Sequence, residues 1–526
     1  MKKNYFGVML DMSGNAVMKA EKVKEYALYL KKIGYNMIQL YTEDTYEVDG
    51  EPFFGYMRGG YSKDDLKEID AYCNSIGIEV IPCIQTLAHL SRIFRWDGYA
   101  DINDADDMLL IDDERTYALI ENMFATLAQC FSSRTVNIGL DEAHRMGLGK
   151  YLRKNGFTDR FALFIKHLKK VISIAEKYGF RAVMWSDMLL RLLSGGDYNA
   201  EAEQISAVKD RVPKNVGLIY WEYFYYKSEQ YREMLQKHKL FGNDVWFAGA
   251  VHTYIGFAPI NDMADDTLRP AMRACREEGI GNILITLWGG SECSYIAALP
   301  ALCYARCIYE GITDEKQIEK RFFEATGEDY RTIRSLDASN TLAMPYLKLP
   351  EVDFSKYVLY QDVFNGFFDT ELTEGTTKKF LAKAEEFEAL SAGRFGYLFQ
   401  TQAKLLRALH AKHDLGIRLR RAYSEGDKEE LSRLYGDILH TAACVEEFYR
   451  AFRAQWYIEN TPQGFDMNDI KLGGLIWRLR SCADRLNDYL QGRAERIEEL
   501  EKPLLKYKGD TANYMQWARI VSANCI

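Results

Sequence analysis

The chain has 526 residues, of which 48% are hydrophobic and 27% are charged, and its formal net charge is −9. This composition is typical of a globular protein with enough apolar side chains for a large core. No block of lysine and arginine stands out, so the sequence predicts no binding to nucleic acid or to an anionic membrane surface. An acidic enzyme with a neutral substrate fits these values.

The cysteines and the N-terminus indicate the compartment. Ten cysteines occur without a Cys-x-x-Cys pair, which in a chain of this length indicates reduced thiols in the core. The apolar run before Asp11 is too short for a signal peptide, and no stretch approaches 18 uninterrupted apolar residues. We therefore expect a soluble, cytoplasmic protein without a transmembrane helix.

Short apolar runs alternate with longer amphipathic stretches over the first 300 residues. Runs that are apolar throughout are typical of parallel strands covered on both faces. The stretch after the first run shows helical spacing, since Val23, Tyr26, Ala27 and Leu30 share one face that ends at Gly34. The eight predicted strands cover residues 5–10, 36–41, 78–84, 135–140, 181–185, 216–221, 245–251 and 282–288.

Eight strand–helix units of this length predict an α/β fold, a closed (β/α)8 TIM barrel, with a doubly wound open sheet as the alternative. After about residue 305 the strand-like runs end and helical periods dominate, as in residues 379–390 and 445–456. We therefore predict a catalytic barrel over residues 1–305 and an all-α C-terminal domain over residues 306–526. The segment 311–317 is the most favourable place for the boundary.

In a barrel of this kind, catalytic side chains cluster at the C-terminal ends of the strands. Carboxylates and aromatic rings recur there. Aromatic faces stack on the apolar faces of sugar rings, and carboxylates accept hydrogen bonds from hydroxyls, so this combination predicts a carbohydrate pocket. A tryptophan at a strand end can also be a core residue. The side chains at the predicted strand ends are Asp11, Glu43, Asp44, Gln85, His89, Asp141, Glu142, Trp185, Asp187, Trp221, Glu222, Tyr223, His252, Tyr254, Trp288 and Glu292.

Other chemistries fit poorly. The sequence contains no His-Glu-x-x-His motif, no phosphate-binding Gly-x-x-x-x-Gly-Lys loop and no Gly-x-Ser-x-Gly elbow. His410 and His413 lie in the helical part and are better explained as surface or packing residues than as ligands. We predict neither a metal nor a cofactor.

The stretch "IGLDEAH" (138–144), together with "LYTEDTYEV", "PCIQTLAHL", "LWGGSE" and the tryptophans of strands five, six and eight, resembles glycoside hydrolase family 20, the β-N-acetylhexosaminidases. The resemblance covers roughly residues 5–300, and the helical tail is similar to that of a bacterial, intracellular branch. It implies an exo-acting enzyme that releases terminal N-acetylglucosamine from small neutral oligosaccharides or glycosides, with N-acetylgalactosamine left open.

The resemblance also implies a retaining, substrate-assisted mechanism, in which the 2-acetamido oxygen of the sugar attacks C1 and forms an oxazoline intermediate. Glu142 would be the general acid and then the base, and Asp141 would stay ionised and hold the acetamido N–H. Glu142 would need a raised pKa, which a neighbouring carboxylate and partial burial would provide.

The remaining roles follow from the same resemblance. Trp185, Trp221 and Trp288 would surround the acetamido methyl group and the sugar face. Tyr254 would donate to the acetamido oxygen, with Tyr223 as its rival. The other expected contacts are Glu292 and Asp11 with sugar hydroxyls, and His89 beside the acid pair.

Two features depart from the family pattern. Many members carry an arginine just after the first strand, whereas "LDMSGN" has none. Many also carry a small domain before the barrel, whereas the barrel predicted here begins almost at Met1. The alternatives are an ordinary two-carboxylate retaining glycosidase acting on sugars without an acetamido group, and a non-catalytic sugar-binding barrel. A homodimer formed through the helical part is left open.

Overall fold

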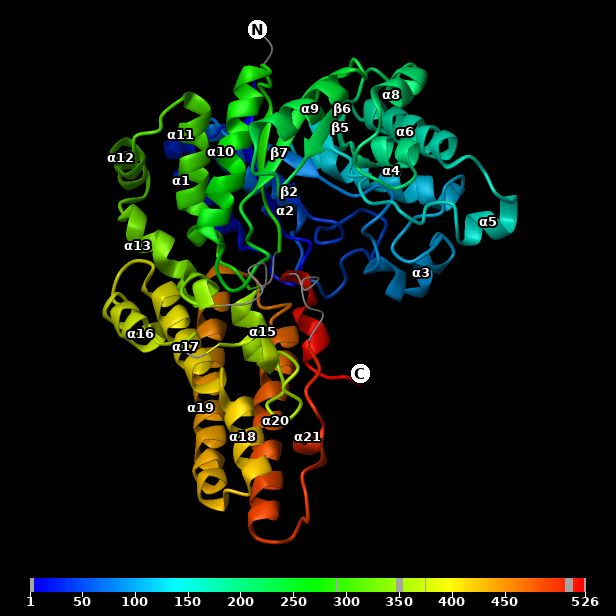
Figure 1. Ribbon diagram of the computed structural model, residues 1–526. Helices are drawn as coiled ribbons and strands as arrows, with labels where there is room; N and C mark the ends of the chain where they lie inside the picture. The colour runs from blue at the N-terminus through cyan, green and yellow to red at the C-terminus, as the bar shows by residue number, and fades with distance from the viewer. Residues whose placement is uncertain (1–3, 290–291, 347–352, 374, 507–513, 525–526) are drawn as a thin grey trace. The chain divides into compact units, whose positions relative to one another are not determined.

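The computed structural model describes residues 4–289, 292–346, 353–373, 375–506 and 514–524 (Figure 1). The chain divides into two compact units. The first comprises Met1–His252, Asn261–Ser291 and Ala298–Tyr330, and the second Thr253–Ile260, Glu292–Ala297 and Arg331–Ile526. All eight strands belong to the first unit. The domain boundary at residue 305 stays a prediction.

The strands of the first unit close into a barrel in chain order, and every neighbouring pair is parallel. The predicted TIM barrel is thereby confirmed, and the open sheet is excluded. The strands are β1 (Phe6–Asp11), β2 (Met37–Tyr41), β3 (Glu79–Cys83), β4 (Thr135–Asn137), β5 (Arg181–Trp185), β6 (Gly217–Trp221), β7 (Val245–Ala250) and β8 (Ile283–Leu287).

Helices alternate with the strands, as the sequence pattern predicted. In α1 (Ala20–Ile33), the predicted face of Val23, Tyr26, Ala27 and Leu30 is buried, and Gly34 ends the helix at a φ of 112°. The other helices of this unit are α2 (Lys63–Ser75), α3 (Asp97–Ala100), α4 (Glu114–Cys130), α5 (Lys150–Asn155), α6 (Arg160–Lys177), α7 (Asp187–Ser194), α8 (Ala202–Val208), α9 (Ser228–Lys239), α10 (Asn261–Glu277), α11 (Leu299–Glu310) and α12 (Glu315–Thr326).

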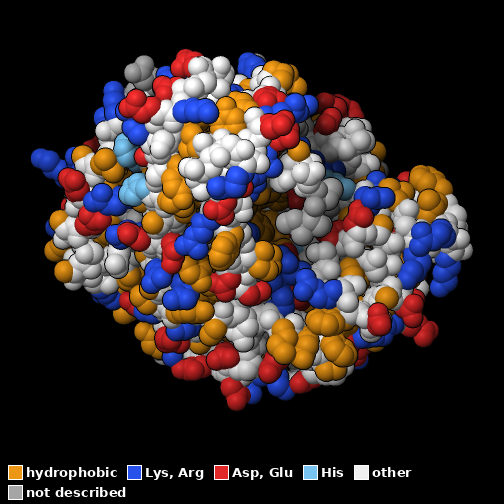
Figure 2. Space-filling model, turned by 90° about the horizontal axis from the view of Figure 1, so that it is seen from below, with side chains coloured by type: hydrophobic (Ala, Val, Ile, Leu, Met, Phe, Trp, Pro, Cys, Tyr) orange, Lys and Arg blue, Asp and Glu red, His pale blue; other side chains and the backbone are white. Residues whose placement is uncertain are grey.

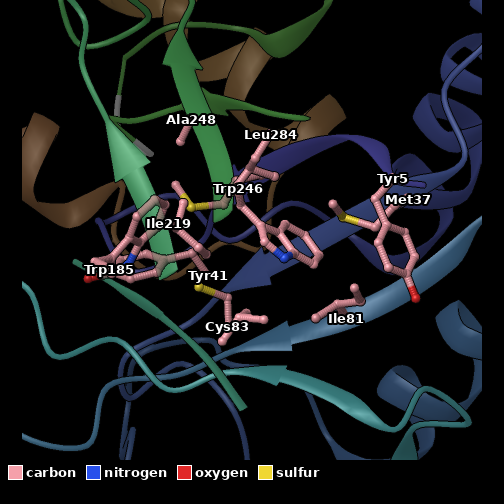
Figure 3. Close-up of a cluster of buried hydrophobic side chains, with 12 residues drawn as sticks. Tyr5, Met37, Tyr41, Ile81, Cys83, Trp185, Ile219, Trp246, Ala248 and Leu284 are labelled. Carbon is pink, nitrogen blue, oxygen red and sulfur yellow. The ribbon is translucent and has the colours of Figure 1, made fainter. Parts of the chain in front are cut away.

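Side chains from alternate strand positions fill the inside of the barrel, so it is a packed core rather than a pore (Figure 3). Tyr5 and Met37 lie at one end of this core, and Tyr41 and Trp185 lie at the other. Tyr41 and Trp185 are the last residues of their strands. The C-terminal mouth of the barrel therefore has an aromatic floor.

Strand β4 is shorter than the sequence pattern indicated, because it ends at Asn137 rather than at residue 140. Gly139 and Leu140 have φ values of 73° and 75°, in the left-handed region that a strand cannot use. The side-chain amide of Gln85 stabilises this turn, since its Oε1 accepts the N–H of Leu140 at 3.3 Å. The turn brings Asp141 and Glu142 out of the barrel wall to its mouth.

The second unit is helical in the residues that the structure describes, which confirms the predicted all-α region. Most of each predicted face is buried, namely Phe380, Ala384 and Phe387 in one helix and Val445, Phe448, Phe452 and Trp456 in the longest helix. Leu390 and Tyr449, which were expected on the same faces, are only partly buried. The helices are α14 (Ala338–Thr341), α15 (Phe354–Tyr360), α16 (Phe380–Ala389), α17 (Gly396–Lys412), α18 (Leu415–Glu425), α19 (Lys428–Glu459), α20 (Asp466–Leu490) and α21 (Glu498–Glu501), with α13 (Tyr330–Arg334) where the units join along the chain.

Within the described ranges, no helix combines the length and apolar character that crossing a membrane requires. On the face drawn in Figure 2, acidic and basic side chains are interspersed, with hydrophobic side chains in small groups between them. This mixture agrees with the even distribution of charge along the sequence.

Gly139 offers a direct test of the turn after β4. A Cβ atom there would lie 2.1 Å from Gln85 Oε1 and 2.8 Å from the carbonyl oxygen of Ile84. At Gly179, with a φ of 78°, a Cβ atom would meet nothing within 4 Å. Both alanine variants carry the strain of a positive φ, and only Gly139→Ala adds a steric clash. We therefore expect Gly139→Ala to lower the free energy of unfolding by about 1–3 kcal/mol more than Gly179→Ala. Urea unfolding measures this difference, and equal losses would contradict the tight turn.

Candidate active site

The side chains at the ends of β3 and β4 converge on Asp141, which is almost fully buried. Gln85 Nε2 donates to Asp141 Oδ1 at 2.8 Å, and His89 Nε2 lies 3.3 Å from Asp141 Oδ2. Burial opposes ionisation of this carboxyl, but the charge of His89 and the hydrogen bond from Gln85 outweigh it and lower the pKa of Asp141. Asp141 is therefore a carboxylate at neutral pH.

The backbone of His89 is held in place by Asp107. The φ of His89 is 59°, and its backbone N–H donates to Asp107 Oδ2 at 2.8 Å. Burial would lower the pKa of the imidazole, but the charges of Asp141, Glu43 and Glu142 prevail and raise it to about 10. The ring is therefore an imidazolium at neutral pH, placed near the carboxyl groups of Asp141, Glu43 and Glu142.

Glu142 follows Asp141 in the chain, and its side chain reaches solvent. Its side chain is 44% exposed, and its Oε2 lies 3.8 Å from His89 Nε2. A φ of 51° at Glu142 aims the two consecutive side chains differently. The Glu142 side chain is therefore only partly buried, and the two acids adjoin the same imidazole nitrogen.

Asp187, at the start of α7, supports the backbone of Glu142. Its carboxyl is fully buried, and its Oδ2 accepts the N–H of Glu142 at 3.1 Å and lies 3.4 Å from Arg191 Nε. Burial and then the charge of Asp141 raise the pKa of Asp187 to about 7. Asp187 thus fixes the position of the residue that carries the exposed acid.

An aromatic wall adjoins the acid pair. Trp288 packs edge-on against Tyr41, with ring centroids 4.8 Å apart, and lies 6.0 Å from Trp185. Its indole N–H donates to the hydroxyl of Tyr223 at 2.9 Å, and Tyr223 stacks on Trp221 at 5.3 Å. The predicted tryptophans therefore lie together. Trp185 itself is fully buried and belongs to the barrel core.

Tyr41 and Tyr223 connect this wall to the acids. The hydroxyl of Tyr41 accepts from Gln85 Nε2 at 3.0 Å, and Gln85 in turn holds Asp141. Burial, with smaller contributions from Asp141 and Glu142, raises the pKa of Tyr223, which keeps its hydroxyl protonated. A neutral hydroxyl beside the acid pair can still donate a hydrogen bond.

Asp11 lies at the end of β1, where the sequence placed it, but its oxygens have protein partners. Oδ1 accepts from the N–H and the hydroxyl of Ser13 at 2.8 and 2.7 Å, and Oδ2 accepts from the N–H of Gly289 at 2.9 Å. In the loop after β1, which lacks an arginine of its own, Arg58 donates to the carbonyl oxygens of Ser13 and Gly14. The guanidinium of Arg58, which comes from the loop after β2, therefore contacts the loop that follows β1.

Tyr254 and Glu292 belong to the second unit. There, Glu292 lies 3.5 Å from Lys356 Nζ and 3.1 Å from Lys471 Nζ. Burial opposes its ionisation, but the two ammonium groups outweigh it and lower the pKa of Glu292. The carbonyl oxygen of Tyr254 accepts from Lys356 at 3.4 Å. The sugar-binding roles of Tyr254 and Glu292 stay predictions, and Gly290 and Ser291 of the "LWGGSE" motif lie outside the described residues.

Three residues of the cluster were visible at strand ends but were not assigned to the site, namely Glu43, Gln85 and Asp187. Glu43 accepts from the hydroxyl of Tyr41 at 3.0 Å, and burial together with Asp11 raises its pKa to about 8. The rule that strand ends carry catalytic residues could have included all three. Arg58 and Asp107 lie inside long loops, and no local pattern marks them.

Outside the cluster, two histidines of the helical part, His410 and His413, contact each other and Thr377. The rings of His410 and His413 stack at 5.9 Å, and each has a nitrogen within 3.2 Å of the Thr377 hydroxyl. In the parts of the chain that the structure describes, no group of three or more His, Cys, Asp or Glu side chains is placed to hold a metal ion.

A (β/α)8 barrel with adjoining carboxylates beside an aromatic wall is typical of enzymes that hydrolyse glycosides. Comparison with known families agrees. The catalytic domain of glycosyl hydrolase family 20 matches residues 31–239, and the glycoside hydrolase 20C C-terminal domain matches residues 328–518. The chain belongs to glycoside hydrolase family 20, which confirms the predicted family and the predicted class of enzyme.

Individual relatives are distant. Hexosaminidase D of Bos taurus is 25% identical over 225 residues, which are 41% of this chain and 62% of that protein. Hexosaminidase D of Homo sapiens is 24% identical over 225 residues, 41% of this chain and 44% of that protein. The matches thus span less than two thirds of each relative's length. Among solved structures, Flavobacterium johnsoniae chitobiase is 14% identical with a TM-score of 0.48, covering 94% of this chain and 74% of that one.

Asp187 gives a prediction for stability as a function of pH. A carboxyl with a folded-state pKa of about 7 and an unfolded value near 3.8 binds more protons in the folded state between these values. Its contribution to stability is therefore present at low pH and is lost as the pH rises through about 7. Asp187→Asn keeps an acceptor for the Glu142 N–H but cannot ionise. We expect the stability of this variant relative to the unmodified protein to increase from pH 4 to pH 7 and then level off.

Asp187→Ala is the matched comparison, because it leaves the Glu142 N–H without its acceptor. It should lower the free energy of unfolding by about 1–3 kcal/mol at pH 5. Denaturant unfolding at several pH values measures both variants. A constant difference between Asp187→Asn and the unmodified protein across this range would contradict the raised pKa.

Proposed function

We propose that the protein is an exo-acting β-N-acetylhexosaminidase that releases terminal N-acetylglucosamine or N-acetylgalactosamine by a retaining, substrate-assisted mechanism. The observation that carries the proposal is the division between the two consecutive acids. Asp141 is buried and held ionised by His89 and Gln85, whereas the Glu142 carboxyl reaches solvent at the mouth of the barrel. These are the different environments that a charge-stabilising base and a proton-transferring acid require.

In the first step, Glu142 donates its proton to the glycosidic oxygen while the acetamido carbonyl oxygen of the bound sugar attacks C1. The bond between C1 and the leaving group breaks, and the leaving group departs as an alcohol. An oxazolinium ring remains, and its N–H faces the carboxylate of Asp141, which stabilises the positive charge.

In the second step, Glu142 acts as the base. It removes a proton from a water molecule that attacks C1 from the side that the leaving group vacated. The bond between C1 and the acetamido oxygen breaks, the acetamido group is restored, and the sugar leaves with its original β configuration. Glu142 is protonated again and is ready for the next turnover.

The environment of Asp141 disfavours the ordinary two-carboxylate mechanism. In that mechanism the second carboxylate must reach C1 and form a covalent bond. Asp141 is 7% exposed, and its two oxygens adjoin the amide of Gln85 and the imidazolium of His89. These contacts suit a carboxylate that stabilises a neighbouring charge better than one that attacks a carbon atom.

The aromatic wall supports a substrate with an acetamido group. Trp288 and Trp221 are partly exposed above the core and offer apolar faces to the methyl group and the sugar ring. For the hydrogen bond to the acetamido oxygen, Tyr254 is the residue that the family resemblance favours, and Tyr223 is the one placed beside the acids and Trp288. The cytoplasmic location and a homodimer also stay predictions.

Loss of either acid should abolish most of the activity. We expect the unmodified protein to hydrolyse 4-nitrophenyl β-N-acetylglucosaminide, and we expect Glu142→Gln and Asp141→Asn each to lower kcat by about 10²–10⁴-fold, since proton transfer contributes this much. His144→Ala, an exposed neighbour, is the control and should keep the rate. Near-normal turnover in both acid variants would disprove the mechanism.

A thiazoline analogue of the oxazoline separates the two glycosidase mechanisms. It has the shape of the intermediate that only the acetamido group can form, so a substrate-assisted enzyme should bind it at least 10²-fold more tightly than N-acetylglucosamine. Competitive inhibition of 4-nitrophenyl β-N-acetylglucosaminide hydrolysis measures this affinity. Binding no tighter than that of the free sugar would favour the two-carboxylate alternative.

A further inference from the structure

Three aromatic side chains in the first unit form a group outside the acid cluster, in which two rings are exposed and Trp96 is partly buried. Phe53 stacks on Trp96, with ring centroids 5.5 Å apart, and Tyr56 meets Trp96 edge-on at 5.4 Å. Phe53 and Tyr56 are each 45% exposed. We call Phe53, Tyr56 and Trp96 the aromatic platform.

The platform stands on the two loops that also supply the acid cluster. Phe53 and Tyr56 lie in the loop after β2, which also contains Glu43. Trp96 lies in the loop after β3, seven residues beyond His89 and directly after a short 3-10 helix, Ile93–Arg95. Because loops after barrel strands lie on the C-terminal face, the platform and the acid cluster share one face of the barrel.

The loop after β2 is held firmly enough to present these rings. A bridge between Tyr46 and Tyr61 closes its stem, and Phe54 packs against Tyr46 at 5.4 Å. Arg58 ties the loop back to Asp44 at 3.3 Å. The hydrophobic anchor Phe54 is buried, whereas its neighbour Phe53 faces solvent. The exposure of Phe53 is therefore a property of an ordered loop.

Exposed rings that contact one another indicate a binding surface, because a folded protein seldom leaves several large apolar side chains together in water. The face of an aromatic ring carries partial negative charge, and the axial C–H groups on the flat face of a β-linked pyranose carry partial positive charge. Rings of this kind suit sugars that are linked by equatorial bonds. An exo-acting enzyme holds one sugar at the acids and must leave all the others outside, on the same face.

We propose that the aromatic platform is a binding subsite for the leaving-group sugars of a β-linked oligosaccharide. The inference rests on the proposed hexosaminidase function and adds a preference for oligosaccharides over glycosides with a small leaving group. The platform contributes apolar contact area and no proton transfer, so it acts on the affinity for the part of the substrate beyond the scissile bond.

The test compares two substrates in the full chain. Trp96→Ala and Phe53→Ala should each lower kcat/KM for the β-1,4-linked tetramer of N-acetylglucosamine by about tenfold relative to kcat/KM for 4-nitrophenyl β-N-acetylglucosaminide, as expected for the loss of one ring contact. The change should appear in KM rather than in kcat. Phe323→Ala, which removes a 59% exposed ring from α12, is the matched control and should leave the ratio unchanged.

The outcomes separate this inference from the function on which it rests. Suppose that the unmodified protein hydrolyses the 4-nitrophenyl glycoside and that Trp96→Ala and Phe53→Ala leave the ratio of the two kcat/KM values unaltered. The subsite proposal is then wrong, and the hexosaminidase proposal stands. If neither substrate is hydrolysed, the hexosaminidase proposal fails. In that case, the affinity of each protein for the tetramer is measured by tryptophan fluorescence. Weaker binding by Trp96→Ala than by the unmodified protein supports the subsite, and equal binding contradicts it.

Discussion

The contact between His89 and Asp141 is the interaction on which the candidate site depends. A buried carboxylate without a partner would take up a proton, because desolvation penalises its charged form. The imidazolium 3.3 Å away reverses this preference, and the carboxylates around His89 in turn keep the imidazole protonated. The charges stabilise one another, so the loss of either partner would change the ionisation of the other.

The backbone arranges these charges at the cost of local strain. Glu43, His89, Leu140 and Glu142 all have positive φ values, and all lie in the loops after β2, β3 or β4. Such conformations cost about 1–3 kcal/mol each and persist only where the surrounding structure holds them. Here the regular barrel holds them: the strands are paired up to their last residues, and the left-handed turns that follow aim each side chain into the mouth.

The barrel could be predicted because its signal is local. Each strand is an uninterrupted apolar run and each helix repeats its own apolar face, so the elements are recognisable one at a time. The adjacency of Asp141 and Glu142 was equally visible. Their different environments were not, because the amide of Gln85 acts over 56 residues of chain and Asp187 over 45. The degree of exposure of the Glu142 side chain was not visible either, because it depends on the left-handed backbone after β4.

The loop after β2 connects the acid cluster with the surface beyond it. Near its start is Glu43, whose negative charge, when ionised, favours the protonated form of His89, and it carries Arg58, which binds both Asp44 and the loop after β1. Phe53 and Tyr56 lie between these two anchored points. The proposed leaving-group subsite and groups that surround Asp141 therefore share one stretch of chain.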